Sequence, residues 1–340
     1  MGAQAAHPPQ EASSGDKLSP TPTPAPSPSP LCTTCAHPAP HVYTTYTSKS
    51  NIRLGVCTNC GAFIDPLIEA PALLLVLDLV LLKPRVFLHL LFNRGSPPLD
   101  AGVTLVPFGA PPAAPPGQPY RARVRHDLAA LTAATLAADV GVRVLPLLQA
   151  PGGFADTVEA VALTVVGAAL ELLAQHAATL ALALVVLYAR GWYPAARADT
   201  RDGRQRSFVP ELVPLVLLYT TLFPLLLQLA LSIWYAPPAS IHEALPTTPA
   251  LAVLPERVVA SLPPALAEGI NAAQDSVVAA WSGANRVWVG TRLLGGMSAG
   301  FGLRVLLPTR PWETTSIVIF GWVAALLVSQ WLSVLEPGLG

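Results

Sequence analysis

The sequence predicts an α-helical multi-span membrane protein with a small cysteine-rich β module near its N-terminus and a disordered, proline-rich N-terminal tail. The 340-residue chain is 52% hydrophobic and only 12% charged, and its mean hydropathy is +0.50, which is unusual for a soluble globular protein. Several apolar runs approach or exceed the roughly 20 residues that cross a bilayer core. All four cysteines lie in two CxxC pairs close to the start of the chain.

The predicted disordered tail covers residues 1–30. It ends in SPTPTPAPSPSP and has almost no bulky apolar residues, so it cannot bury enough surface to offset the entropy of ordering. No apolar run follows a basic start, so we expect no cleaved secretory signal and insertion through an internal span. Lysine plus arginine equals aspartate plus glutamate at 20 each, which gives no support for nucleic acid as a partner.

Residues 31–69 are predicted to form a zinc ribbon, which is the β module of the fold class. Cys32, Cys35, Cys57 and Cys60 have the spacing C-x2-C, then 21 residues, then C-x2-C, as in two metal-binding knuckles joined by a hairpin. Threonine, tyrosine and valine between the pairs favour β structure. Four thiolates complete a closed tetrahedron, so the predicted Zn²⁺ is structural and supplies stability that so small a core lacks.

Other roles of the thiols remain open at this stage. Two disulfides would form in an oxidising compartment, whereas a module facing the cytosol would be kept reduced. Thiol redox catalysis normally needs one CxxC pair, not two. His37 and His41 are close enough in sequence to replace a cysteine ligand, but with four cysteines present we expect them to be loop residues.

The segment 70–94, APALLLVLDLVLLKPRVFLHLLFNR, is the first predicted membrane-embedded element. It has only 13 residues before Lys83 and contains Asp78 and Pro84, so it fits a bent span, a re-entrant hairpin or a helix in the headgroup plane. Asp78 and Lys83 are five residues apart, which does not match the spacing of neighbours on a helix, so no ion pair is predicted.

Basic residues near this segment are candidates for contacts with the membrane surface. Lys83, Arg85 and His89 follow one another around Pro84, and they fit either contacts with lipid phosphates or side chains that extend along apolar surface to the interface. Lys49 and Arg53 lie on the module and would orient it against an anionic leaflet.

Three further helices are predicted to cross the membrane, since each contains a long uncharged apolar run. One of them also contains Glu171 and His176, and because ionisable residues at membrane depth are costly, we expect these two to have a specific role or to face other helices. Pro224 is predicted to kink another. The three predicted spans are 158–189, 209–236 and 314–335.

The remaining segments are predicted to connect the spans. Segment 95–157 is a proline-rich linker with an interfacial helix, and 237–313 is a loop that also contains sequence suited to the membrane surface. The connection 190–208 holds five arginines against two aspartates, which predicts a cytosolic loop. Four crossings, beginning with 70–94, then put both termini in the cytosol.

Residues 31–94 resemble the homology domain of the Arv-like family of eukaryotic endoplasmic reticulum membrane proteins. The motifs occur in the family's order: a double CxxC, NIRL directly before the second pair, and the tail DLVLLKPRVFLHLLFN. One departure is Ala36, where the pattern has glycine after the first pair. The resemblance implies zinc ligation by the four cysteines and motif membership for Asn51, Ile52, Arg53, Leu54, Asp78, Lys83, Pro84, His89 and Asn93.

The expected function comes from this resemblance alone. It implies a non-enzymatic protein of the endoplasmic reticulum, and also of the Golgi membrane, that mediates sterol uptake, trafficking and distribution and affects sphingolipid metabolism and GPI-precursor assembly. Its partners would be membrane lipids: sterol, sphingolipid or a GPI precursor. The alternative is an accessory subunit that scaffolds a membrane glycosyltransferase complex of early GPI biosynthesis. We expect no enzyme, because the sequence offers no paired carboxylates at helical spacing in the spans, no nucleophile elbow and no phosphate loop.

Overall fold

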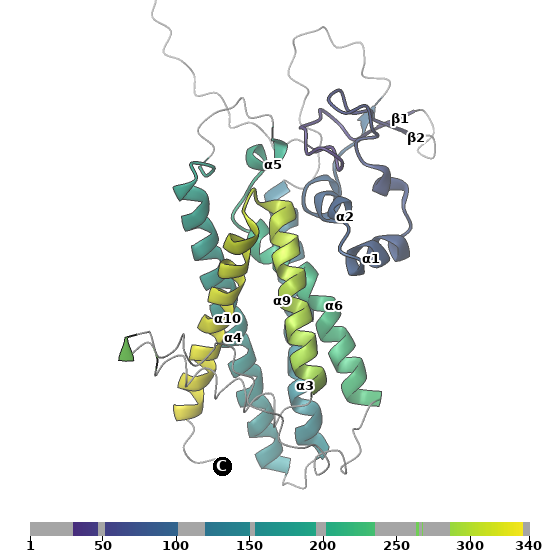
Figure 1. Ribbon diagram of the computed structural model, residues 1–340. Coiled ribbons are helices and arrows are strands. Elements are labelled where there is room, and N and C mark those ends of the chain that lie inside the picture. Colours follow the sequence, from purple (N-terminus) through teal and green to yellow (C-terminus); the bar gives the residue numbers. More distant parts are fainter. Residues whose placement is uncertain are drawn as a thin grey trace, which may run out of the picture.

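The computed structural model describes residues 30–46, 52–100, 120–149, 154–194, 202–234, 263, 264, 267 and 286–335. Within these residues, long helices form a bundle, and a small β module that carries the four cysteines lies at one end of it (Figure 1). The predicted fold class is confirmed, since four helices are long and apolar enough to cross a membrane. Residues 1–29 of the predicted tail lie outside the described residues, so their disorder stays a prediction.

A three-stranded sheet supports the β module, which we call the cysteine module (residues 31–69). β1 (Tyr43–Thr45) pairs with the antiparallel β2 (Ile52–Leu54), in the segment whose composition predicts a hairpin. β3 (Leu99–Asp100) pairs in parallel with β1, so the strand order is β2-β1-β3. Because β3 follows the first membrane-embedded segment in the chain, the sheet ties that segment back to the cysteine module.

The segment 70–94 is broken into short helices. α1 has nine residues, about 14 Å at 1.5 Å per residue, which is about half the thickness of a hydrocarbon core. It ends before Leu82, which has a left-handed φ of 54°, and Pro84 begins the next helix. The elements are η1 (Pro66–Glu69, a 3-10 helix), α1 (Ala72–Val80), α2 (Pro84–Leu88) and η2 (His89–Asn93, a π-helix).

The turn at Leu82 brings together two charged side chains, Asp78 and Lys83, that a continuous helix would keep apart. Lys83 Nζ lies 2.5 Å from Asp78 Oδ1, although the two residues are five apart in sequence. A continuous helix would direct them to different faces, whereas the left-handed residue folds the chain back and brings them together. The residue spacing does not predict this ion pair, because the spacing rule assumes a continuous helix.

Five long helices make up the bundle in the described part of the chain. α6 is the most buried of the candidate spans, since more than half of its apolar span is buried, against less than a fifth of each of the others. α3 and α9 pack on α6, α4 packs on α3, and α10 closes the ring by packing on α4 and α9. The helices are α3 (Tyr120–Gln149), α4 (Phe154–Ala189), α6 (Leu212–Trp234), α9 (Arg286–Leu306) and α10 (Pro311–Leu335), with α5 (Gly203–Arg206) between α4 and α6.

Three of the four candidate spans overlap the predicted ones, but the fourth lies in α3. It covers Tyr120–Leu145, where the sequence predicts a linker with an interfacial helix. The arginines at 121, 123 and 125 occupy only the first turns of this helix. Asp139 and Arg143, farther along, form ion pairs inside the bundle. The charges that suggest an interfacial helix are therefore of two kinds: arginines at the end of a candidate span, and Asp139 and Arg143, which pair inside the bundle.

α9 occupies part of the predicted loop 237–313. Its apolar stretch, Leu293–Leu306, is shorter than the candidate spans, yet α9 packs against α6 and α10. A small residue allows this close approach, because a side chain at Gly296 would collide with the ring of Trp322. The length of an apolar run in the sequence does not reveal a helix that is held by close packing.

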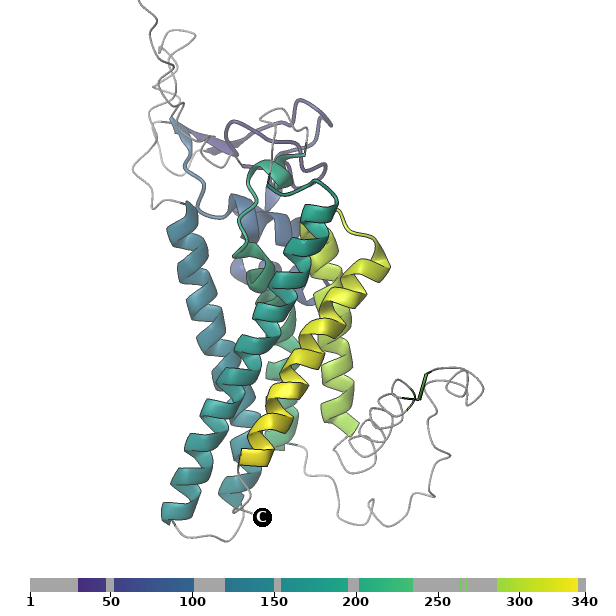
Figure 2. The ribbon, with the colours of Figure 1, turned by 90° about the vertical axis from the view of Figure 1, so that its left-hand side faces the viewer.

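The cysteine module and the end of α10 lie at opposite ends of the bundle (Figures 1 and 2). The start of α3, the end of α4 and the turn between α9 and α10 all lie at the module end. A membrane crossed by the bundle would separate the module from the end of α10. The prediction of two cytosolic termini counts four crossings and takes 70–94 as the first. In the structure, the helices that alternate in direction are α3, α4, α6, α9 and α10, so the crossings are counted from α3.

Candidate metal centre

The four cysteines are presented by two knuckles of the same construction. In the first knuckle, the Ala36 amide donates to the Cys32 carbonyl over 2.9 Å, and in the second the Gly61 amide donates to the Cys57 carbonyl over 2.9 Å. A β-bridge flanks each knuckle, between Leu31 and Pro38 and between Val56 and Phe63. The repeated CxxC spacing thus produces the same backbone turn twice, and each turn directs two thiols to one side.

The residue after each knuckle has a left-handed backbone conformation. Gly61 has φ of 71°, which glycine adopts freely, and Ala36 has φ of 56° at the equivalent position. Alanine in place of glycine at position 36 therefore raises the conformational free energy of the turn but leaves its backbone shape unchanged.

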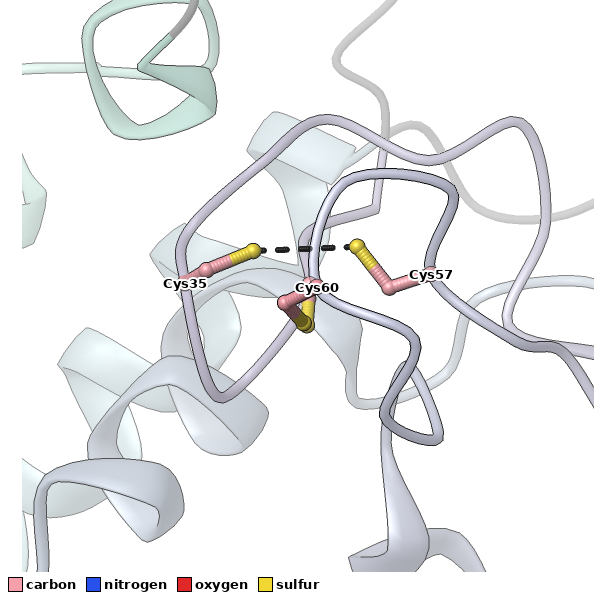
Figure 3. Close-up of side chains that lie close together, drawn as sticks. Cys35, Cys57 and Cys60 are labelled. Atoms are coloured by element: carbon pink, nitrogen blue, oxygen red, sulfur yellow. Dashed lines mark hydrogen bonds between the residues drawn. The ribbon is translucent and has the colours of Figure 1, made fainter.

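The four sulfur atoms converge on one point. All of them lie within 4.8 Å of one another, with 3.7 Å between Cys32 Sγ and Cys60 Sγ and 3.6 Å between Cys35 Sγ and Cys57 Sγ. Figure 3 shows the Cys35, Cys57 and Cys60 side chains pointing toward each other. A tetrahedral ion with bonds of about 2.3 Å to sulfur would separate its ligands by about 3.8 Å. The four thiols are close enough to bind a metal ion, and none is in a disulfide.

The thiols differ in burial and in acidity. Cys32 and Cys57 are buried, whereas Cys60 is exposed. Burial raises the pKa of the Cys32 thiol to about 12. Burial also acts to raise the pKa of Cys35, but hydrogen bonds from the His37 backbone and the Asn59 side chain lower it to about 7. Cys35 therefore ionises near neutral pH, and a cation bound by all four sulfurs must displace protons.

The histidines near the knuckles do not join the cluster. Among the described residues, the four cysteines are the group of metal-binding side chains close enough to share an ion, and neither His37 nor His41 is part of it. Four sulfur donors without an open position are typical of a structural site, not a catalytic one.

A buried polar network, which we call the Asp65 cluster, fastens the cysteine module to the helices. It consists of Leu31, Asp65, His89 and Asn93, all less than a tenth exposed. Asp65 Oδ2 lies 2.8 Å from both His89 Nδ1 and Asn93 Nδ2. The Asn93 amide also accepts from the Leu31 backbone N–H over 2.8 Å and donates to the Leu31 carbonyl over 2.7 Å. Leu31 directly precedes the first cysteine, so the network positions the metal centre.

The Asp65 cluster corrects the sequence-based interpretation of His89. That side chain is 7% exposed and bonded to Asp65, so it does not face lipid phosphates. Lys83 pairs with Asp78, and Arg85 and Arg53 are exposed. Lys49 and Asn51 lie outside the described residues. The spacing of His89 and Asn93 fits neighbours on one helix face, but no sequence pattern links them to Asp65, which lies on a different segment.

A second contact joins the first knuckle to the connection between α4 and α6. The Gly203 amide of α5 donates to the Ala36 carbonyl over 2.9 Å. A side chain at Gly203 would collide with Leu31 and meet the Ala36 carbonyl oxygen at 2.9 Å. The cysteine module is thus held from two sides, by η2 and by α5.

Comparisons with known proteins give a consistent result. The model of a family described as the Arv1-like family matches residues 31–247, which is more than half of the chain. Relatives include Protein arv1 of Schizosaccharomyces pombe, 44% identical over 66 residues (19% of this chain, 25% of the relative), and Protein ARV1 of Saccharomyces cerevisiae, 40% identical over 63 residues (18% and 19%). Protein arv1 homolog of Dictyostelium discoideum is 35% identical over 77 residues (22% and 31%).

These matched segments span less than a third of the length of each of those relatives. No significant match to a solved structure was found.

Proposed function

We propose that this chain, which belongs to the Arv1-like family, is a non-enzymatic protein that handles sterol and other lipids in the endoplasmic reticulum membrane. The family match over residues 31–247 carries the proposal, since it covers the cysteine module together with α3, α4 and α6. Four apolar helices make the chain a membrane protein, and the family is consistent with sterol and lipid homeostasis. Effects on sphingolipid metabolism and GPI-precursor assembly belong to the same proposal.

We further propose that the four cysteines hold a structural Zn²⁺. The sulfur separations of 3.6 and 3.7 Å fit tetrahedral zinc, and all four coordination positions would be filled by protein. Bound zinc would supply the folding energy that the module lacks, since the hydrophobic cluster around its cysteines has only five buried residues in the described part of the chain. The Asp65 cluster and Gly203 would then keep the module fixed on the bundle.

The module end of the bundle is proposed to face the cytosol. Arginines gather there, at the start of α3, the end of α4 and around α5, and short basic segments stay cytosolic. A reducing cytosol would also keep the thiols available for a metal.

Transfer of lipid between membranes tests the proposed function. The full chain in liposomes should speed the movement of a fluorescent sterol to acceptor liposomes, compared with liposomes that lack protein. The absence of both sterol binding and transfer, together with stoichiometric co-purification of glycosyltransferase subunits from membranes, would replace the proposal with the scaffold alternative.

A further inference from the structure

The ring of five helices borders a small, partly open cavity. Its volume is about 70 Å³, and α3, α4, α6, α9 and α10 all contribute to its lining. Thr135 on α3 lies roughly 22 Å along the helix from Tyr120, and Trp322 on α10 lies roughly 17 Å from Pro311. Both helices start at the module end, so the cavity lies deep within the bundle, at the depth of the membrane.

One unpartnered polar atom in the lining belongs to His176. Its Nδ1 lies 2.8 Å from the Leu172 carbonyl oxygen, which can only accept, so in the neutral ring Nδ1 carries the proton. Nε2 is then a hydrogen-bond acceptor, and this buried atom has no partner among the described residues. An unsatisfied acceptor in a helix bundle is costly unless a ligand or water completes it.

The second unpartnered atom is the hydroxyl of Thr135. This side chain is 2% exposed, and its buried Oγ1 has no partner among the described residues. Other span hydroxyls bond to the carbonyl four residues earlier, as Thr164 does to Ala160 and Thr221 does to Leu217. Thr135 does not, so its hydroxyl remains available as both donor and acceptor.

The charged residues beside the cavity disfavour an anionic ligand. Arg143 lies 2.9 Å from an Asp139 oxygen and 2.5 Å from a Glu171 oxygen, so both carboxylates are directed at one guanidinium. A phosphate or carboxylate brought close to these two acids would be repelled. The ligand is therefore expected to have a neutral head.

We propose that the cavity binds the hydroxyl head of a neutral membrane lipid. The hydroxyl donates to His176 Nε2 and accepts from Thr135 Oγ1, while Leu136, Leu225 and Trp322 contact the adjoining carbon atoms. Water alone fits less well, because the space holds several molecules whereas the lining offers two unpartnered polar atoms. This inference rests on the proposed lipid function and assigns its site.

Photolabelling of the full chain in lipid nanodiscs tests the site. The probes are a photoreactive sterol with a free hydroxyl, the same sterol with the hydroxyl methylated, and a photoreactive diacylglycerol, and labelled peptides are mapped by mass spectrometry. The alcohol probes should label cavity-lining peptides of α3, α4 or α6, and the methyl ether should label them about tenfold less, because it cannot donate to His176. The amounts of labelling by the sterol and by the diacylglycerol show which of these two lipid classes the cavity prefers.

Matched variants attribute the labelling to the two residues. His176→Phe and Thr135→Val should each lower cavity labelling about tenfold, since each removes one hydrogen bond to the ligand. Thr164→Val also removes a hydroxyl from a span, but outside the cavity, and should leave labelling unchanged. Thermal unfolding of each variant shows whether it is folded. If the two cavity variants do not fold, the difference in labelling between the sterol and its methyl ether on the unaltered chain still tests the proposed site.

Three results would overturn the assignment: equal labelling by the alcohol and its ether, undiminished labelling of the folded His176→Phe and Thr135→Val variants, or no alcohol labelling of cavity peptides, as expected for a cavity filled only by water. Sterol transfer without cavity labelling would remove this site and leave the proposed function standing. Lack of both would remove both.

Discussion

At the scale of single residues, the two knuckles differ at the position that needs a left-handed backbone. Gly61→Ala should lower the free energy of unfolding by about 1 kcal/mol, because alanine at positive φ is strained while a new Cβ there would meet nothing within 4 Å. Ala36 already occupies the equivalent place, so the variant should still bind metal. Denaturant unfolding and metal analysis of the purified variant measure the two effects; loss of the metal would contradict the equivalence of the knuckles.

The ligands themselves give a second residue-scale prediction. A Cys57→Ser, Cys60→Ser variant should lose its zinc, from about one ion per chain to almost none, since two remaining thiols cannot complete a tetrahedron. Elemental analysis by mass spectrometry measures this directly. His41→Ala is the control and should keep the ion, because His41 is not part of the sulfur cluster. Unchanged zinc in the double variant would exclude the cysteines as its ligands.

At the scale of elements, the junction between the cysteine module and η2 depends on one amide. Asn93→Leu keeps the size of the side chain but leaves the Leu31 backbone N–H and carbonyl unpaired, and removes a donor from Asp65. We expect a loss of about 2–3 kcal/mol in unfolding free energy, because buried polar groups without partners pay their desolvation cost. Thr58→Val, at an exposed position of the second knuckle, is the control. Equal stability of the two variants would show that the Asp65 cluster does not fasten the module.

The same elements show what can be predicted from sequence and what cannot. The two knuckles follow from a local spacing, so the cysteine cluster and its hairpin are predictable. α3 is missed because Asp139 and Arg143 interrupt its apolar run, and Glu171, the second partner of Arg143, lies on another helix. Asp65 and His89 are likewise 24 residues apart, so no local pattern joins them. Whether a charged residue can lie inside the bundle depends on partners from distant segments, and a local sequence pattern does not reveal those partners.

At the scale of the whole molecule, the alternating helices place the cysteine module and the end of α10 at opposite ends of the bundle. A glycosylation acceptor tag added after Gly340 should be glycosylated in the endoplasmic reticulum, whereas one placed in the 190–208 connection should not. The physical reason is that the end of α10 lies opposite the basic module end. Gel mobility with and without a glycosidase reads out both tags. Glycosylation in the 190–208 connection would put the thiols in an oxidising compartment and reverse the proposed orientation.

The contact between Ala36 and Gly203 bears on the order in which the molecule is made. During synthesis the first knuckle emerges long before α5, and α3 and α4 are made between them. The contact therefore closes only when both helices have been inserted and the chain has returned to the side where it began. With the proposed Zn²⁺ bound, the first knuckle would present the Ala36 carbonyl in its final position before α5 is made, so metal binding and helix insertion would both affect this hydrogen bond.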